Sequence, residues 1–183
     1  MSVATETCDY HGADRSPRRN TPPIFNLGLS EERMLEISEV REDELPERAA
    51  LYQQLSPADA SVPNMRLVLS RNADNPSHVV WAARRGGRLV GSLLAVTCEM
   101  LFGQCRSFMV VEDVVVDASH RRTGVGAALL RTAEDYARTR NCSYIMLVTD
   151  TYREDAQRFY ALAGYQSDGF TAFKKTLPDG ATE

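Results

Sequence analysis

Clustered metal ligands and paired thiols are missing from this sequence. Only three histidines occur among 183 residues, and the four cysteines stand apart without a C-x-x-C pair. A zinc site or a disulfide framework needs such ligands at close spacing. We therefore expect no metal site and a chain with reduced thiols. The cysteines are Cys8, Cys98, Cys105 and Cys142.

Long apolar runs and an excess of positive charge are missing as well. The first residues, MSVATETCDYHGADRSPRRN, lack the apolar segment of a signal peptide, and no later run approaches the roughly 18 residues of a membrane span. The formal net charge of −4 at pH 7 argues against a general nucleic-acid binder. We expect a cytoplasmic protein that contacts neither membrane nor nucleic acid, and we leave a homodimer open.

The sequence does contain enough apolar residues for one sizeable core. Hydrophobic residues make up 43% of the chain and charged residues 25%, which is typical of a globular domain. Residues 1–31 are polar and show no lasting periodicity, so we interpret them as a mobile tail; a short arm lying on a neighbouring surface through PPIFNLGL is the alternative. We place the folded domain at residues 32–178 and a C-terminal tail at residues 179–183.

Periodicity in the first part of the domain predicts four strands and two helices. The helix in EDELPERAALYQQL places Leu45, Ala49 and Tyr52 on one face. A hairpin is predicted at Gly86 and Gly87, where two strand patterns adjoin. In chain order the predicted strands are MLEISEVRE, HVVWAARR, RLVGSLLAVTCEM and CRSFMVVEDVVVD, and the second helix includes NMRLVLSR.

The last part of the domain predicts a strand, helix, strand unit. A helix follows Gly124 and the strand CSYIMLVT follows it; then comes the helix REDAQRFYALAGY, with Gly164 as its C-cap. GFTAFKKTL is expected as a closing strand whose Lys174 and Lys175 cap the sheet edge. The sum is an α/β fold (α+β mixed sheet): an antiparallel meander leads into a right-handed parallel β-α-β crossover, with helices on both faces. The apolar stripe of the helix after Gly124 is Val125, Ala128, Leu129, Ala133 and Tyr136.

The turn before that helix has the features of an anion-binding site. In RRTGVGA the first N–H groups of the helix are unpaired, and the helix dipole places partial positive charge there. Gly124 and Gly126 remove Cβ atoms that would hold an anion away, while Arg121 and Arg122 add charge. A Walker loop is excluded because Gly-Lys is missing, and the dinucleotide pattern lacks its third glycine. A tight strand-to-helix connection without a ligand is the alternative.

Three segments together resemble the GNAT superfamily of acyl-CoA-dependent N-acyltransferases across residues 34–177. In that family Q/R-x-x-G-x-G/A is the coenzyme A pyrophosphate loop, and Arg121, Gly124 and Gly126 occupy its positions. More narrowly, VEDVVVD and CSYI look like the glucosamine-6-phosphate N-acetyltransferases, although Arg153 stands where many family members have Asn and TDTYREDAQRFY is longer than in those enzymes. The three segments are VEDVVVDASHRRTGVGAALL, the strand after it, and DAQRFYALAGY.

The resemblance implies acetyl-CoA as cosubstrate and no metal. It implies that the strand Val114 to Val116 splays from the next parallel strand, and that the pantetheine arm lies in the gap. A backbone N–H near Val114 or Val115 then stabilises the oxyanion when an amine attacks the thioester directly. The expected coenzyme contacts are Val114, Val115, Val116, Arg121, Arg122, Thr123, Gly124, Val125, Gly126 and Ala127.

Glu112 and Asp113 are the expected partners of the incoming amine. An alkyl amine has a pKa near that of Lys, about 10, so it must lose a proton before it attacks. A carboxylate flanked by valines is costly to bury unpaired, which favours a role as base or as ammonium-binding group. In a regular strand only one of the two faces the cleft, unless a bulge re-aims the other. A structural salt bridge to Arg84 or Arg106 is the alternative.

Tyr160 is the expected general acid. The resemblance places a family tyrosine at this position of the FY pair, close to the thioester sulfur, and a phenol can protonate the departing thiolate. A simple core position on the apolar stripe is the alternative. Arg153, at the start of the same helix, is expected to contact an anionic group of the substrate or the coenzyme, or else to be solvated.

The sequence therefore predicts an N-acetyltransferase that moves the acetyl group of acetyl-CoA to a primary amine of a small molecule by direct attack. An amino sugar or an amino-acid-like metabolite is the expected acceptor. Two alternatives stay open: a protein Lys or N-terminal acetyltransferase, and a non-catalytic acyl-CoA-binding module.

Overall fold

The computed structural model describes residues 34–56 and 60–177, and the predicted tails at 1–31 and 179–183 lie outside the described residues. Within these residues five strands form one sheet in chain order, β1-β2-β3-β4-β5. Neighbouring strands are antiparallel up to β4, whereas β4 and β5 are parallel. The strands are β1 (Leu35–Glu39), β2 (His78–Arg85), β3 (Arg88–Cys98), β4 (Ser107–Val116) and β5 (Cys142–Met146).

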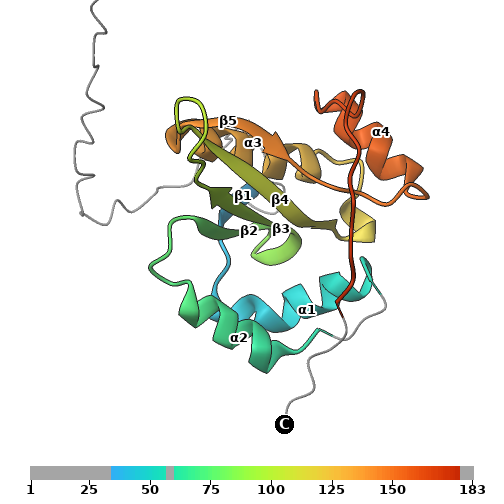
Figure 1. The fold of residues 1–183 in the computed structure, drawn as a ribbon. Helices are drawn as coiled ribbons and strands as arrows, with labels where there is room; N and C mark the ends of the chain where they lie inside the picture. The colour runs from blue at the N-terminus through green and yellow to red at the C-terminus, as the bar shows by residue number, and fades with distance from the viewer. Residues whose placement is uncertain (1–33, 57–59, 178–183) are drawn as a thin grey trace, which may run out of the picture.

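Helices cover both faces of this sheet (Figure 1). α1 and α2 pack on one face, and α3 and α4 pack on the other. The mixed sheet, the parallel crossover through α3 and the helices on both faces confirm the predicted α/β fold. The helices are α1 (Leu45–Gln53), α2 (Val62–Arg71), α3 (Val125–Thr139) and α4 (Glu154–Leu162), with 3-10 turns η2 (Glu42–Glu44) and η3 (Ala118–His120).

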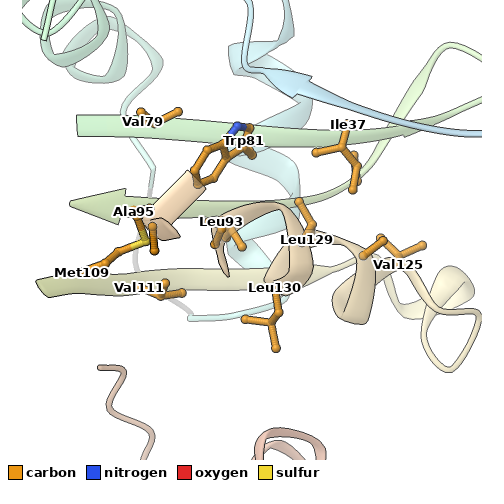
Figure 2. Packing of buried hydrophobic residues seen from close by; sticks show 14 of the residues in the cluster. Ile37, Val79, Trp81, Leu93, Ala95, Met109, Val111, Val125, Leu129 and Leu130 are labelled. Atoms are coloured by element: carbon orange, nitrogen blue, oxygen red, sulfur yellow. The ribbon is translucent and has the colours of Figure 1, made fainter. Parts of the chain in front are cut away.

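The larger core lies between the sheet and α3 (Figure 2). Leu93 and Met109 of the sheet belong to the same fully buried cluster as Leu129 and Leu130 of α3. Burying such a side chain contributes about 1.5–3 kcal/mol. The predicted stripe on α3 is confirmed, except that its last member, Tyr136, is only partly buried. This packing holds the N-terminus of α3 at the end of β4.

The buried face of α1 differs from the predicted one. The spacing predicted Leu45, Ala49 and Tyr52, but the buried side chains are Leu45, Arg48 and Leu51. Arg48 tolerates burial because its Nε donates to a buried serine of β3 at 3.1 Å and its guanidinium lies 4.5 Å from the Tyr52 ring centroid. A hydrophobic pattern counts only apolar positions, so it misses a buried cation that has its own partners.

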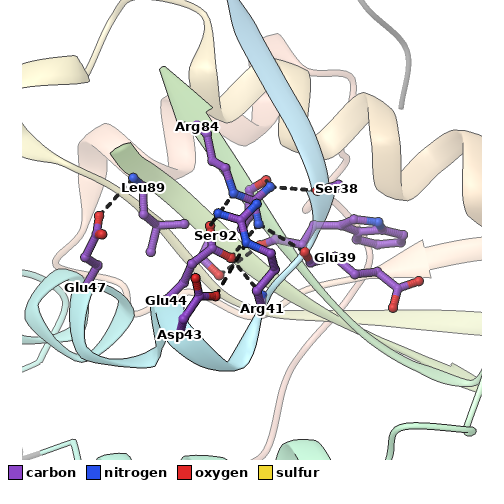
Figure 3. A network of polar contacts seen from close by, with 11 residues as sticks. Ser38, Glu39, Arg41, Asp43, Glu44, Glu47, Arg84, Leu89 and Ser92 are labelled. Carbon is purple, nitrogen blue, oxygen red and sulfur yellow. Dashed lines mark hydrogen bonds and ion pairs between the residues drawn. The ribbon is translucent and has the colours of Figure 1, made fainter. Parts of the chain in front are cut away.

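A buried ion pair fastens α1 to the sheet (Figure 3). Arg84 of β2 donates to both carboxylate oxygens of Glu44, the residue that precedes α1, and also to two groups of β1. Arg41 forms a second ion pair with Glu44 at 2.9 Å. Burial alone would raise the pKa of Glu44, but the hydrogen bonds and charges of Arg84 and Arg41 hold it below its ordinary value. The pair therefore stays ionised and fixes where α1 begins.

The predicted closing strand is wrong. Residues 169–177 form no strand, and Phe170 and Phe173 are 76% and 95% exposed. The expected edge role of Lys174 and Lys175 is therefore wrong too. Strand propensity supplies no partner by itself, because a strand needs a neighbour at matching register.

The described part of the chain, residues 34–56 and 60–177, offers neither a metal-ligand cluster nor a membrane-spanning helix. In this part of the chain no group of three or more His, Cys, Asp or Glu side chains is placed to hold a metal ion. Nor does any of its helices combine the length and the apolar character that crossing a membrane requires.

Candidate active site

The centre of the candidate site is a bulge in β4. The register with β3 pairs Leu94 with Glu112 and Ser92 with Val115, so β4 carries one extra residue between these pairs. Asp113 lies in the bulge with a left-handed backbone, φ +55°. Because a bulge re-aims the side chains beside it, neighbouring carboxylates can serve one site.

β4 and β5 separate beside this bulge. Their pairing ends at Val110 and Met146, and β5 stops there although the sequence predicted a strand to Thr149. Figure 1 shows the two strands diverging toward their C-terminal ends. Among the described residues, the segment Val114 to Val116 therefore has no partner strand on the β5 side. Unpaired backbone groups of this kind can hydrogen-bond an extended ligand.

The predicted anion-binding turn lies at the N-terminus of α3. Gly124 is the N-cap of the helix, with φ +87°, and Arg122 also has a left-handed backbone, with φ +61°. Ala128 donates its N–H to the Gly124 carbonyl. The N–H groups of residues 125–127 precede this bond and so lack acceptors within the helix. Such groups, together with the helix dipole, favour a bound anion.

Side chains hold this turn against β4 and β2. Arg121 Nε donates to the Val116 carbonyl at 3.2 Å, and the Thr123 hydroxyl donates to a carbonyl of the preceding 3-10 turn at 2.7 Å. Arg85 donates to Thr123 Oγ1 at 3.3 Å. Arg121, Arg122 and Thr123 are exposed. The turn is therefore tied to the sheet while its charged groups remain accessible to an anion.

Gly126 lies where α3 packs against α4. A Cβ at this position would lie 3.0 Å from Phe159 Cζ and 3.6 Å from Val116 Cγ2. The missing Cβ makes room for α4. At Gly124, by contrast, a Cβ would meet no described protein atom within 4 Å, and its contact with the coenzyme stays a prediction. The space beside Gly124 is open to a ligand.

A pocket of about 390 Å³ lies on the α1 and α2 side of the sheet and reaches the bulge. We call it the α1–α2 pocket. Its wall is mainly apolar and includes Val40, Met65, Val68, Leu69, Val80 and Leu94. Arg48, Tyr52 and Asp113 also line it. Asp113 belongs both to the pocket and to the bulge, so the pocket reaches the part of β4 that follows its last pairing with β5.

Tyr52 links a buried cation to the bulge. Its hydroxyl donates to Asp113 Oδ2 at 2.8 Å and accepts from the Arg48 guanidinium. Burial raises the pKa of Tyr52 well above its ordinary value; the charge of Arg48 opposes this shift and the charge of Asp113 adds to it. The hydroxyl therefore stays protonated and keeps its bond to Asp113.

Glu112 lies beside Asp113 and forms no salt bridge with Arg84 or Arg106, which was the alternative to a role in the site. Arg84 is engaged by the ion pair with the start of α1, and Arg106 donates to a backbone carbonyl of β5 at 3.0 Å. Burial raises the pKa of Glu112, the charge of Asp113 raises it further, and the charge of Lys174 opposes the shift. A carboxylate with a raised pKa accepts a proton more readily, which suits a general base.

Tyr160 approaches the same region from α4. Its side chain is half-buried on the predicted stripe with Ala156 and Ala163. Burial raises the pKa of Tyr160; the charge of Arg153 opposes the shift, and the charge of Glu112 adds to it. Both charges are thus close enough to act on the Tyr160 hydroxyl. Arg153 is the N-cap of the same helix, whereas Glu112 belongs to β4.

Sequence reasoning missed the roles of Arg48, Tyr52 and Lys174. Arg48 and Tyr52 are four residues apart on α1, a spacing that places both on one helical face and that signals a pair. Lys174 acts on Glu112 because the segment after α4 runs back toward α1 (Figure 1). No local pattern indicates that approach, since the two residues are far apart in the chain.

Comparison with known proteins places the chain among acetyltransferases. Residues 37–165 match the acetyltransferase (GNAT) family. N-acetyltransferase family 8 member 3 of Rattus norvegicus is 30% identical over 89 residues, which are 49% of this chain and 39% of that protein. Aminoglycoside N(6')-acetyltransferase type 1 of Serratia marcescens is 28% identical over 135 residues, 71% of this chain and 88% of that enzyme. The match thus spans well under half the length of the rat protein.

A solved structure shows the same fold. The crystal structure of glucosamine-6-phosphate N-acetyltransferase from Arabidopsis thaliana superimposes with a TM-score of 0.67 at 16% identity, over 77% of this chain and 97% of that one. The likeness at this identity concerns the fold and not the substrate. The superfamily resemblance seen in the sequence is confirmed, since the family match covers most of the described domain. The chain belongs to the GNAT acetyltransferase family.

Proposed function

We propose that this protein is an acetyl-CoA-dependent N-acetyltransferase that acetylates a primary amine of a small molecule by direct attack. The observation that carries the proposal is the position of Asp113. It lines the α1–α2 pocket from the bulge, where β4 leaves β5. An amine held in that pocket lies next to the gap that suits an extended acyl donor.

The chain has groups that fit the donor. Acetyl-CoA supplies the acetyl group as a thioester. Arg121, Arg122 and the N–H groups of residues 125–127 suit its pyrophosphate, because they combine positive charge with unpaired donors. In the segment Val114 to Val116, an unpaired backbone N–H donates to the carbonyl oxygen under attack. Arg153, at the start of α4, contacts a further anionic group of the substrate or the coenzyme.

The two carboxylates and Tyr160 divide the proton transfers. Asp113 binds the ammonium group of the acceptor, and Glu112 takes the proton that the amine must lose. As the nitrogen–carbon bond forms and the carbon–sulfur bond breaks, the Tyr160 hydroxyl donates its proton to the departing sulfur. The acetyl group forms no covalent bond with the protein in this scheme, so no cysteine is required as a nucleophile.

The pocket supports a small acceptor over a protein substrate. Its volume of about 390 Å³ lies at the lower end of the range of about 300–1,000 Å³ that is typical of small-molecule sites. The Serratia relative is named for an aminoglycoside, which is also an amine of limited size. The acid and base groups at the bulge favour an enzyme over a non-catalytic acyl-CoA-binding module.

A panel of amines, assayed by release of the free coenzyme A thiol, tests the proposal. It contains amino sugars, amino acids, alkyl amines, a lysine peptide and a peptide with a free N-terminus. We expect thiol release with at least one small amine, dependent on both substrates. Release with the peptides alone would favour the protein acetyltransferase, and acetyl-CoA binding without release would favour the non-catalytic module.

Replacing Asp113 by Asn is expected to raise the KM for the amine roughly tenfold, because a hydrogen bond to a charged group is worth about 1.5–3 kcal/mol. The Kd for acetyl-CoA should change little, since Asn keeps the size of the side chain and the groups proposed for the pyrophosphate lie at the N-terminus of α3. Initial rates at saturating acetyl-CoA give the first value and calorimetry the second. An unchanged KM would leave Asp113 as a structural partner of Tyr52.

The base role of Glu112 predicts that kcat/KM for the amine falls at acidic pH, which gives the pH profile an acid limb. The base must be ionised, so activity falls as the pH drops through the pKa of Glu112, which burial and Asp113 raise above its ordinary 4.5. The limb should disappear in Glu112→Gln, and it should move to lower pH in Asp113→Asn, because one raising charge is then gone. Glu99→Gln, at an exposed position after β3, is the control. A limb that persists unmoved in Glu112→Gln contradicts the base role.

A further inference from the structure

Arg48 is a buried cation in the wall of a pocket that we assign to a cationic amine. Arg48 is 7% exposed, and none of the ion pairs among the described residues includes it. Tyr52 and Ser92 accept hydrogen bonds from only some of the N–H groups of the Arg48 guanidinium. A buried charge is costly without a counter-charge. The remaining donors are therefore suited to an anionic group of the ligand.

Asp113 lies on the other side of the Tyr52 hydroxyl. Two hydrogen bonds in series, from Arg48 to Tyr52 and from Tyr52 to Asp113, limit the separation of the two charged groups to about 6 Å. An α-amino acid carries its ammonium and carboxylate groups on one carbon atom. A single zwitterion lying across Tyr52 can thus reach both charges.

The rest of the wall is suited to a hydrocarbon side chain. Met65, Val68 and Leu69 of α2 face the pocket, and so do Val80 of β2 and Leu94 of β3. Apolar surface removed from water by such a wall favours binding. A sugar hydroxyl or a second ammonium group against these apolar residues would lose its hydration without gaining a partner. The polar residues Ser61, Asn64 and His78 line other parts of the pocket.

We propose that the α1–α2 pocket takes an α-amino acid with an apolar side chain as the acetyl acceptor. Its carboxylate binds Arg48, its amine binds Asp113, and its side chain lies against the apolar wall. This assignment rests on the proposed function and narrows its acceptor. It disfavours amino sugars and aminoglycosides, which bring no carboxylate to Arg48.

The test compares leucine with two analogues that lack its carboxylate, 3-methylbutylamine and leucinamide, and with glycine, which lacks its side chain. Thiol release gives kcat/KM, and calorimetry gives the Kd of each compound for the whole protein. We expect leucine to exceed both analogues about tenfold in kcat/KM, since charge-assisted hydrogen bonds to Arg48 are lost. The alkylamine is more basic than leucine and the amide less basic, so a preference over both cannot come from basicity. Glycine should be a poorer acceptor than leucine.

Arg48→Gln is expected to remove this preference. The ratio of its kcat/KM values for leucine and 3-methylbutylamine should fall to about one, because only leucine loses a carboxylate contact, whereas the lost hydrogen bonds to Tyr52 and Ser92 affect both acceptors alike. Arg66→Gln is the matched control: Arg66 lies exposed on α2 and pairs with Glu42 outside the pocket, so it should keep the preference for leucine. If Arg48→Gln does not fold, the comparison of ligands on the unchanged protein decides alone.

The outcomes separate the two proposals. Equal kcat/KM for leucine and both analogues overturns the amino-acid assignment and leaves the N-acetyltransferase in place. Absence of thiol release with every amine overturns the proposed function. In that case, calorimetric binding of leucine at least fivefold tighter than that of 3-methylbutylamine still supports the pocket assignment, and the lack of such a difference overturns it.

Discussion

Replacing Tyr160 by Phe is expected to lower kcat roughly tenfold to a thousandfold, the range of a lost general acid. The departing thiolate has a parent thiol with a pKa near 8.5, judged by free Cys, and without the phenol it must leave unprotonated or take its proton from water. Burial raises the pKa of Tyr160 above its ordinary value; Arg153 opposes the shift and Glu112 adds to it. The hydroxyl therefore stays protonated through neutral and mildly alkaline pH.

The measurement is kcat at saturating concentrations of both substrates, where the absence of a pre-steady-state burst shows that product release does not limit turnover. Tyr160→Phe keeps the ring that packs 5.2 Å from Phe159 and 6.1 Å from Tyr165, centroid to centroid, so Tm and acetyl-CoA affinity should change little. Tyr144→Phe is the control, because this ring stacks on Phe108 of β4 at a half-exposed position. An undiminished kcat in Tyr160→Phe would show that Tyr160 is a core residue and not the general acid.

Replacing Gly124 by Val is expected to weaken acetyl-CoA binding roughly a hundredfold. Gly124 has φ +87° at the N-cap of α3, and a β-branched residue adopts that conformation only with strain. The turn relaxes, and the N–H groups of residues 125–127 move away from the pyrophosphate. Losing two charge-assisted hydrogen bonds at about 1.5 kcal/mol each accounts for the hundredfold change.

Calorimetry with acetyl-CoA measures this effect, and Gly87→Val provides a matched control. Gly87 has φ +75° in the β2–β3 hairpin, and a Cβ there also meets no described atom within 4 Å, so it gives similar strain away from the site. Gly126→Val is a poorer test, because its side chain would displace Phe159 of α4. Equal acetyl-CoA affinity in Gly124→Val and in the unchanged protein would remove the turn from the donor site.

The features that rest on local signals were predictable from the sequence. The stripe from Val125 to Ala133 identified α3, because apolar residues at helical spacing bury one face whatever they pack against. The glycines at 86 and 87 marked the hairpin, and RRTGVG marked the turn before α3. In each case a few neighbouring residues determine the backbone.

The predicted closing strand, which does not form, shows the limit of what local sequence signals determine. Phe170 and Phe173 have strand propensity, but residues 169–177 find no neighbour at matching register and stay exposed. β5 likewise stops at Met146, because β4 turns away from it after Val110. Pairing is a property of two segments, so one segment's composition does not determine it.

The candidate site depends most on the tertiary structure. The sequence by itself determined which carboxylates and which tyrosine on α4 are available, since their identities and their elements are local facts. Only the fold decided that a bulge turns Asp113 toward Tyr52 and that Arg48 lies buried behind it. The physical reason is that register shifts, burial of a charge and contacts between distant segments depend on the free energy of the whole packed chain.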